Sequence, residues 1–173
     1  RVAGDATFDG HHATDYMVYA HLQLVQDEAA RKAMQQSFVL KPIDNFAAAF
    51  AYAAMPARMA LERGDWATAA MLPLTPAADA YPWKKYPQAE AVNAYARGIG
   101  AARAGNAMLA REQQGRLIAL RDAASDPDLR PQQRAVANLC LGMGIDDAYL
   151  SVRELAQAVD WVHHGVPEGR AKL

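Results

Sequence analysis

Two histidines and an aspartate near the start of the chain are the first residues whose types and spacing could do chemistry. His11 and Asp15 are four residues apart in a stretch with a helical apolar pattern, so both would lie on one face of a helix, beside His12. Imidazole nitrogens and carboxylate oxygens at this spacing can bind one metal ion. A polar, solvated helix start is the simpler interpretation, and the spacing alone leaves both open.

A second group of candidates lies in the segment YPWKKYP, residues 81–87. Trp83 and Tyr86 offer rigid aromatic contact area, and Lys84 could hold an anion, so this segment could contact a ligand or a protein partner. In the alternative interpretation the aromatic side chains fold back and cover a gap between helices.

The remaining reactive side chains have ordinary structural explanations. His163 and His164 close the last predicted helix, where polar or cationic side chains suit the negative end of the helix dipole. Glu90 and Glu112 are expected on solvated helix faces. Cys140 is the only cysteine, so no internal disulfide can form, and we interpret it as a small buried hydrophobe. We find no nucleophile-elbow, zinc-protease or phosphate-loop motif.

Composition limits the class of protein that positions these residues. The length of 173 residues suits one domain, and its richness in alanine and paucity of Val, Ile and Thr favour helices over a large sheet. A net charge of −1 supplies no basic field that would attract nucleic acid. No apolar run reaches the roughly 18 residues of a membrane span. The compartment stays open between cytoplasm and periplasm.

A short hinge interrupts the helical pattern four times. The hinges fall at Val25, Gly64, Gly105 and about Met143, at intervals of about 40 residues, which is typical of stacked helical hairpins. Hairpins of this kind bury their apolar faces against their neighbours. We therefore predict an all-α chain, a single helical-repeat domain over residues 1–173, with antiparallel hairpins at about 11–37, 45–72, 87–124 and 131–164.

The segments ERGDWATAA and AARAGNAMLA, residues 62–70 and 101–110, resemble the tetratricopeptide (TPR) family. The motif of that family has a small residue seven positions before the hinge glycine and an alanine five positions after it. The corresponding residues are Val18, Ala57, Gly98 and Val136 before the hinges, and Ala30, Ala69, Ala110 and Ala148 after them. Residues 11–124 also resemble uncharacterised bacterial proteins described only as TPR-containing. The resemblance implies an α-α superhelix, a TPR-like solenoid, with these small residues buried where helices cross.

The same resemblance implies a binding surface. In TPR proteins the first helix of each hairpin lines a concave groove, through positions thirteen, ten, nine and six before the hinge. Here those positions are His12, Asp15, Tyr16 and Tyr19 in the first unit, Met55 and Arg58 in the second, and Val92, Tyr95, Ala96 and Ile99 in the third. Tyrosine offers contact area with few rotors to freeze, and Arg58 offers a fork for a carboxylate.

The leading interpretation is a non-catalytic module, without metal or cofactor, that binds a peptide or protein partner in this groove. Its predicted partner-binding residues are His12, Asp15, Tyr16, Tyr19, Arg58 and Tyr95, together with Trp83 and Lys84 from the loop. The alternative is a small-molecule or metal-binding enzyme that uses the region of His11, His12 and Asp15 and the Trp83 loop. A homo-oligomer stays open, and so does a groove filled by residues 73–87.

Overall fold

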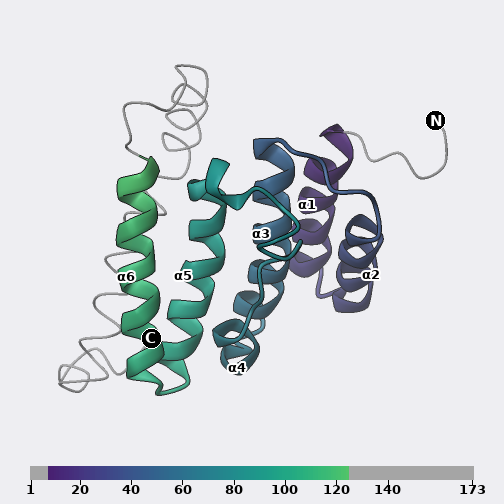
Figure 1. Cartoon of the computed structure of the whole chain (residues 1–173). Coiled ribbons are helices and arrows are strands. Elements are labelled where there is room, and N and C mark those ends of the chain that lie inside the picture. Colours follow the sequence, from purple (N-terminus) through teal and green to yellow (C-terminus); the bar gives the residue numbers. More distant parts are fainter. Residues whose placement is uncertain (1–7, 125–173) are drawn as a thin grey trace.

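The computed structural model describes residues 8–124, which fold entirely into helices and connecting segments, with no strand among them (Figure 1). The helices are α1 (Phe8–Gln23), α2 (Asp27–Phe38), α3 (Phe46–Glu62), α4 (Trp66–Ala70), α5 (Pro87–Arg103) and α6 (Ala107–Ala124), with a short 3-10 turn at Trp83–Lys85. The all-α prediction is confirmed for this part of the chain. The predicted fourth hairpin at about 131–164, its hinge near Met143, Cys140 and the pair His163 and His164 lie outside the described residues.

Side-chain caps explain where several helices begin. The side chain of Asn45 accepts a hydrogen bond from the Ala48 N–H at 2.8 Å, and that of Asp65 accepts from the Thr68 N–H at 3.1 Å. Each satisfies a backbone donor that the first turn of a helix leaves without a partner. Helix α1 begins at Phe8, about three residues before the start predicted for the first hairpin. Within residues 8–124, no helix combines the length and apolar character needed to cross a membrane.

The three turns between paired helices have the same geometry. Val25, Gly64 and Gly105 adopt positive φ angles of 58°, 60° and 79°. At each turn the hinge N–H donates to the carbonyl three residues earlier, and the next N–H donates to the carbonyl five residues earlier. This pattern satisfies the last carbonyls of the helix and reverses the chain. The predicted hinges at these three positions are confirmed, and Val25 holds a conformation that is strained for a β-branched residue.

Small residues lie where the paired helices cross. Ala30, Ala69 and Ala110, each five residues after a hinge, are fully buried. Val18 belongs to the same core cluster as Ala30, and Ala57 to the same cluster as Ala69. The predicted burial of the three alanines is therefore confirmed, and any larger side chain at these positions would force the helices apart.

The hairpins stack so that their first helices lie side by side. Helix α3 packs between α1 and α5, and α4 and α6 pack against α5 (Figure 1). A close approach occurs at Gly100 of α5, where an added Cβ atom would lie 2.4 Å from the Ala70 nitrogen and 2.7 Å from the Ala69 Cβ. Gly100 therefore sets how closely α5 can approach α4.

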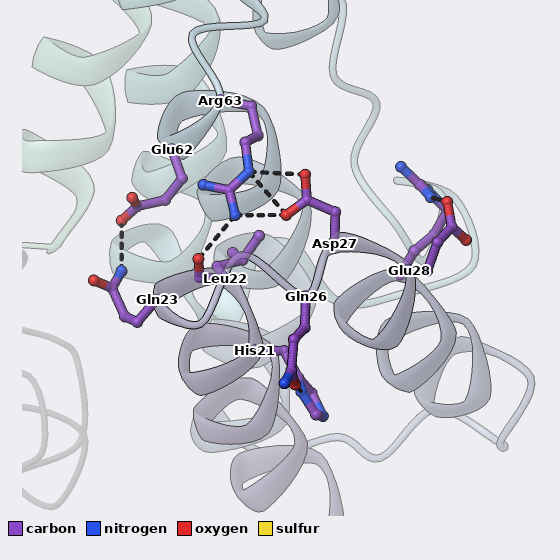
Figure 2. A network of polar contacts seen from close by, with 9 residues as sticks. His21, Leu22, Gln23, Gln26, Asp27, Glu28, Glu62 and Arg63 are labelled. Atoms are coloured by element: carbon purple, nitrogen blue, oxygen red, sulfur yellow. Dashed lines mark hydrogen bonds and ion pairs between the residues drawn. The ribbon is translucent and has the colours of Figure 1, made fainter.

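Arginines at the ends of α3 and α5 contact the first and second hinges, and Figure 2 shows the first of these contacts. Arg63, at the end of α3, donates from Nη2 to the Leu22 carbonyl at 2.8 Å and from Nε to both carboxylate oxygens of Asp27 at 2.9 Å. This contact lowers the pKa of Asp27. At the second hinge, the guanidinium of Arg103 lies 5.6 Å from the ring centroid of Trp66. The end of α3 thus holds the first hinge, and the end of α5 holds the second.

Candidate functional site

Four predicted residues form an exposed surface on α1 and α3, which we call the tyrosine–arginine patch: His12, Tyr16, Tyr19 and Arg58. Tyr16 is 61% exposed and Tyr19 is 43% exposed. The guanidinium carbon of Arg58 lies 5.4 Å from the Tyr19 ring centroid, which is within range of a cation–π contact. The ring of His12 meets that of Tyr16 edge to face, with centroids 4.9 Å apart. The patch therefore offers two tyrosine rings, each held against a neighbouring side chain.

Asp15 lies beneath this patch rather than on it. Only 4% of Asp15 is exposed, and its Oδ1 lies 3.2 Å from Nε of Arg58. These two atoms are close enough for an ion pair but are poorly aligned for a hydrogen bond, whereas Nη2 donates to Oδ2 at 3.3 Å. Burial raises the pKa of Asp15, and Arg58 and then His12 lower it. The prediction that Asp15 contacts a partner, or is solvated, is therefore wrong, because its carboxylate is buried where it anchors Arg58.

This ion pair also changes the role of Arg58. The sequence suggested that the Arg58 guanidinium would donate hydrogen bonds to the carboxylate of a partner. Instead it pairs with Asp15 and lies over the Tyr19 ring. The positive charge is thus largely compensated within the protein. Arg58 positions the tyrosine ring and leaves a patch of low net charge.

His11 is neither solvated nor available to a metal. It is fully buried, with Nδ1 lying 2.7 Å from the Ser37 Oγ and Nε2 lying 2.9 Å from the Tyr52 hydroxyl. The Tyr52 oxygen already accepts the Ile43 N–H at 3.3 Å, so the tyrosine can donate its own hydrogen to His11. The polar helix start predicted for His11 is wrong, because both ring nitrogens are used inside the core.

One feature of the sequence, a serine at a core position of α2, could have indicated this buried hydrogen-bond network. Ser37 continues the buried stripe of α2 formed by Ala30 and Ala33, so a polar residue occupies a core position there and needs a partner. A hydroxyl beside an imidazole also resembles a nucleophile and its base. Ser37 is only 2% exposed, so a substrate cannot reach it.

Two of the three α1 residues of the enzyme alternative, His11 and Asp15, are buried and have partners within the protein. Within residues 8–124, no group of three or more His, Cys, Asp or Glu side chains is arranged to hold a metal ion. His11 is committed to Ser37 and Tyr52, and Asp15 to Arg58. Only His12 of the three remains exposed.

The Trp83 loop folds back onto the helices. Trp83 is only 3% exposed, and its indole N–H donates to the Pro76 carbonyl at 2.9 Å. Its ring packs in a cluster with Ala49 of α3 and Ala89 of α5. The prediction that Trp83 contacts a partner is therefore wrong, because the ring fills the space above the starts of α3 and α5.

The rest of this loop is tied to the segment before α3. Tyr81, also buried, donates its hydroxyl hydrogen to the Ile43 carbonyl at 2.8 Å. Asp44 accepts from Lys85 Nζ at 2.5 Å and from the Tyr86 hydroxyl at 2.8 Å, and these contacts lower its pKa. Lys84 is exposed on the 3-10 turn, as a partner contact would require.

The predicted groove positions on α3 and α5 are buried or only partly exposed. Met55 and Ala96 are fully buried, so their predicted place in an open groove is wrong. Met55 packs with Val18 and Leu22 of α1, because neighbouring helices cover this position on α3 and α5 but not on α1. Tyr95 is half-buried on α5, the helix next to α3, and packs against the cluster that contains Ala94.

A shallow depression of about 410 Å³ lies between α5 and α6. Its lining carries side chains of both charges and comprises Leu74, Glu90, Asn93, Ala94, Arg97, Glu112, Gln113 and Arg116. Glu90 is only 8% exposed and accepts the Arg116 Nε–H at 2.9 Å. The solvated position predicted for Glu90 is therefore wrong, since α6 covers it.

Buried His11 predicts a loss of stability in mild acid. Burial lowers its pKa, so the unfolded chain binds a proton more readily than the folded one as the pH falls below about 6.5. The contribution of neutral His11 to the free energy of unfolding is therefore fully present above that pH and is lost as the pH falls below it. We expect urea denaturation to show a smaller free energy of unfolding at pH 5.5 than at pH 7, and a weaker pH dependence for His11→Gln.

The other histidines are the same in both proteins, so the difference between the two pH profiles isolates His11. Parallel profiles for the parent and His11→Gln would contradict the assignment of a neutral, buried imidazole.

No protein-family model matches this sequence, and the searches of curated proteins and of solved structures also give no match. Function therefore has to be argued from the contacts of the described residues.

Proposed function

We propose that residues 8–124 are a TPR-like helical-repeat module that binds an extended peptide segment at the tyrosine–arginine patch. The repeat assignment is supported by the three matching hinges, the buried alanines five residues after them and the row formed by α1, α3 and α5. Each helix pair of such an array contacts mainly its neighbours and leaves one side of the row free for ligands.

One observation carries the binding proposal. Tyr16 and Tyr19 are large, exposed aromatic residues, and Tyr19 is held beneath a guanidinium that the buried carboxylate of Asp15 anchors. Pre-positioned tyrosines lose little conformational entropy on binding and are frequent hot spots.

The chemistry of the patch favours a partner of low charge. Because Asp15 compensates Arg58, and no other charged residue belongs to the patch, the ligand that fits is a segment with proline or aromatic side chains that stack on the rings. We expect its affinity to change little with salt concentration, in contrast to an acidic peptide.

Selection from a displayed library of random peptides tests the proposal. We expect the full chain to enrich proline- or aromatic-containing peptides, and a synthetic copy of an enriched peptide to bind Tyr19→Ala about thirtyfold more weakly, which corresponds to roughly 2 kcal/mol. Met71→Ala, which truncates an exposed side chain at the end of α4, is the matched control and should bind as the parent does.

Two results would reject this function. One is a selection that enriches only acidic peptides whose binding disappears with salt. The other is an enriched peptide that binds Tyr16→Ala, Tyr19→Ala and the parent with equal affinity. Circular dichroism of each variant shows whether its helices are intact, so loss of fold is distinguished from loss of the site.

A further inference from the structure

An overlapping surface of α1, which shares Tyr16 with the tyrosine–arginine patch, carries a second inference. Five residues follow one another at helical spacing along its outer side, and we call them the α1 end face: Ala13, Tyr16, Met17, Ala20 and Leu24. Tyr16, Met17 and Leu24 are 61%, 51% and 65% exposed, and both alanines are exposed. Leu24 continues the helix, since its N–H donates to the Ala20 carbonyl at 3.1 Å. An apolar stripe of this length normally faces another element.

The same positions on α3 and α5 are the ones that receive a neighbouring hairpin. Counted back from the hinges, Tyr16 corresponds to Met55 and Ala96, both fully buried. Met55 packs with Val18 and Ala30 of the first hairpin, and Ala96 packs with Ala57 and Ala69 of the second.

The position four residues after Tyr16, on the same side of the helix, repeats this relation. Ala20 corresponds to Met59, which packs against the first hairpin, and to Gly100, which touches Ala69 and Ala70. Only on α1, within residues 8–124, does this stacking face lack a covering helix.

We propose that the α1 end face pairs with the α1 end face of a second copy of this chain, as two antiparallel helices related by a two-fold axis. Charge favours a copy over a charged partner. Between His12 and Leu24 the only charged side chain is Asp15, which is buried against Arg58, so identical faces meet without repulsion. The exposed residues of α6, in contrast, include Arg111, Glu112 and Arg116.

The geometry of α1 suits this pairing. Its 16 residues span about 24 Å, and Ala13 and Ala20 are small enough to let a second helix approach to about 8–10 Å. In an antiparallel pair each helix N-terminus lies beside the C-terminus of the other, which the helix dipoles favour. One helix per protomer buries less than the roughly 800 Å² per partner of a standard interface, so the dimer is weak and reversible.

Sedimentation velocity of the full chain tests this proposal. We expect the mean mass to rise from that of the 18.8 kDa monomer toward the dimer as the concentration increases from micromolar to nearly millimolar. Met17→Glu with Leu24→Glu places charges on both faces and should weaken self-association at least about tenfold. Met108→Glu with Ile118→Glu makes the same change to exposed residues of α6 and should leave it unaltered.

Cross-linking gives a second, independent measurement. In a Cys140→Ser background, Ala20→Cys lies near the middle of the α1 end face, where a two-fold axis brings it close to its own copy. We expect mild oxidation to link Ala20→Cys into dimers much faster than Ala119→Cys, which is exposed on α6. A chain that stays monomeric throughout, equal effects of the two double variants, or equal cross-linking rates would each overturn the proposal.

Discussion

Replacing Gly100 with alanine is expected to lower the free energy of unfolding by about 3 kcal/mol, although alanine has the higher helix propensity. The added methyl carbon would lie 2.4 Å from the Ala70 nitrogen and 2.8 Å from the Ala69 carbonyl carbon. Both are backbone atoms that cannot rotate away, so α5 would have to shift from α4. Urea denaturation monitored by circular dichroism measures the loss.

Gly115 provides the matched control for this experiment. It lies in α6, which is also a long helix, and nothing lies within 4 Å of the Cβ atom that an alanine would add there. Gly115→Ala should therefore raise stability by up to about 1 kcal/mol, because alanine restricts the unfolded chain. If both substitutions were stabilising, the close contact between α5 and α4 described above would be wrong.

Replacing Tyr52 with alanine should cost still more, about 4 kcal/mol. Tyr52 is 1% exposed, and its ring centroid lies 4.8 Å from that of His11, 5.6 Å from Tyr81 and 6.1 Å from Phe38. Removing it leaves a cavity among α1, the connector before α3 and the Trp83 loop. The same denaturation experiment reports the effect.

Tyr52→Phe separates the ring from the hydroxyl. Phenylalanine keeps the aromatic contacts but removes the oxygen that serves both His11 and the Ile43 N–H, so we expect an intermediate loss of about 1–3 kcal/mol. A phenylalanine variant as stable as the parent would mean that the hydroxyl network contributes nothing. Equal losses for the alanine and phenylalanine variants would mean that the ring packing contributes nothing.

Local chemistry explains which parts of the fold were predictable. A glycine after an apolar helical pattern, followed by a capping residue and a small residue at a fixed offset, marks a helical hairpin, and Gly64 with Asp65 and Ala69 shows all three signals. Helix positions follow from such short-range patterns, so the observed helices begin and end close to their predicted bounds.

Burial of polar side chains could not be predicted in the same way. His11 and Asp15 lie on the side of α1 that faces other helices, and their partners Ser37, Tyr52 and Arg58 are 26 to 43 residues distant in sequence. From the sequence alone, a buried histidine with both nitrogens hydrogen-bonded cannot be distinguished from an exposed one, because its partners are distant along the chain. The exposed patch was only partly predictable, because within residues 8–124 the equivalent positions on α3 and α5 are covered by a neighbouring helix and those on α1 are not.

The strained turn at Val25 has a consequence for the order in which the hairpins form. Gly64 and Gly105 reach positive φ without steric cost, so their turns can close early and locally, whereas an isolated Val25 turn is unfavourable. Arg63 supplies the compensating contacts, on the Leu22 carbonyl and on Asp27, but only after the whole of α3 has formed. Assembly should therefore spread from the glycine hinges toward the N-terminus, and α1 and α2 should be the first helices to separate when the domain is pulled or heated.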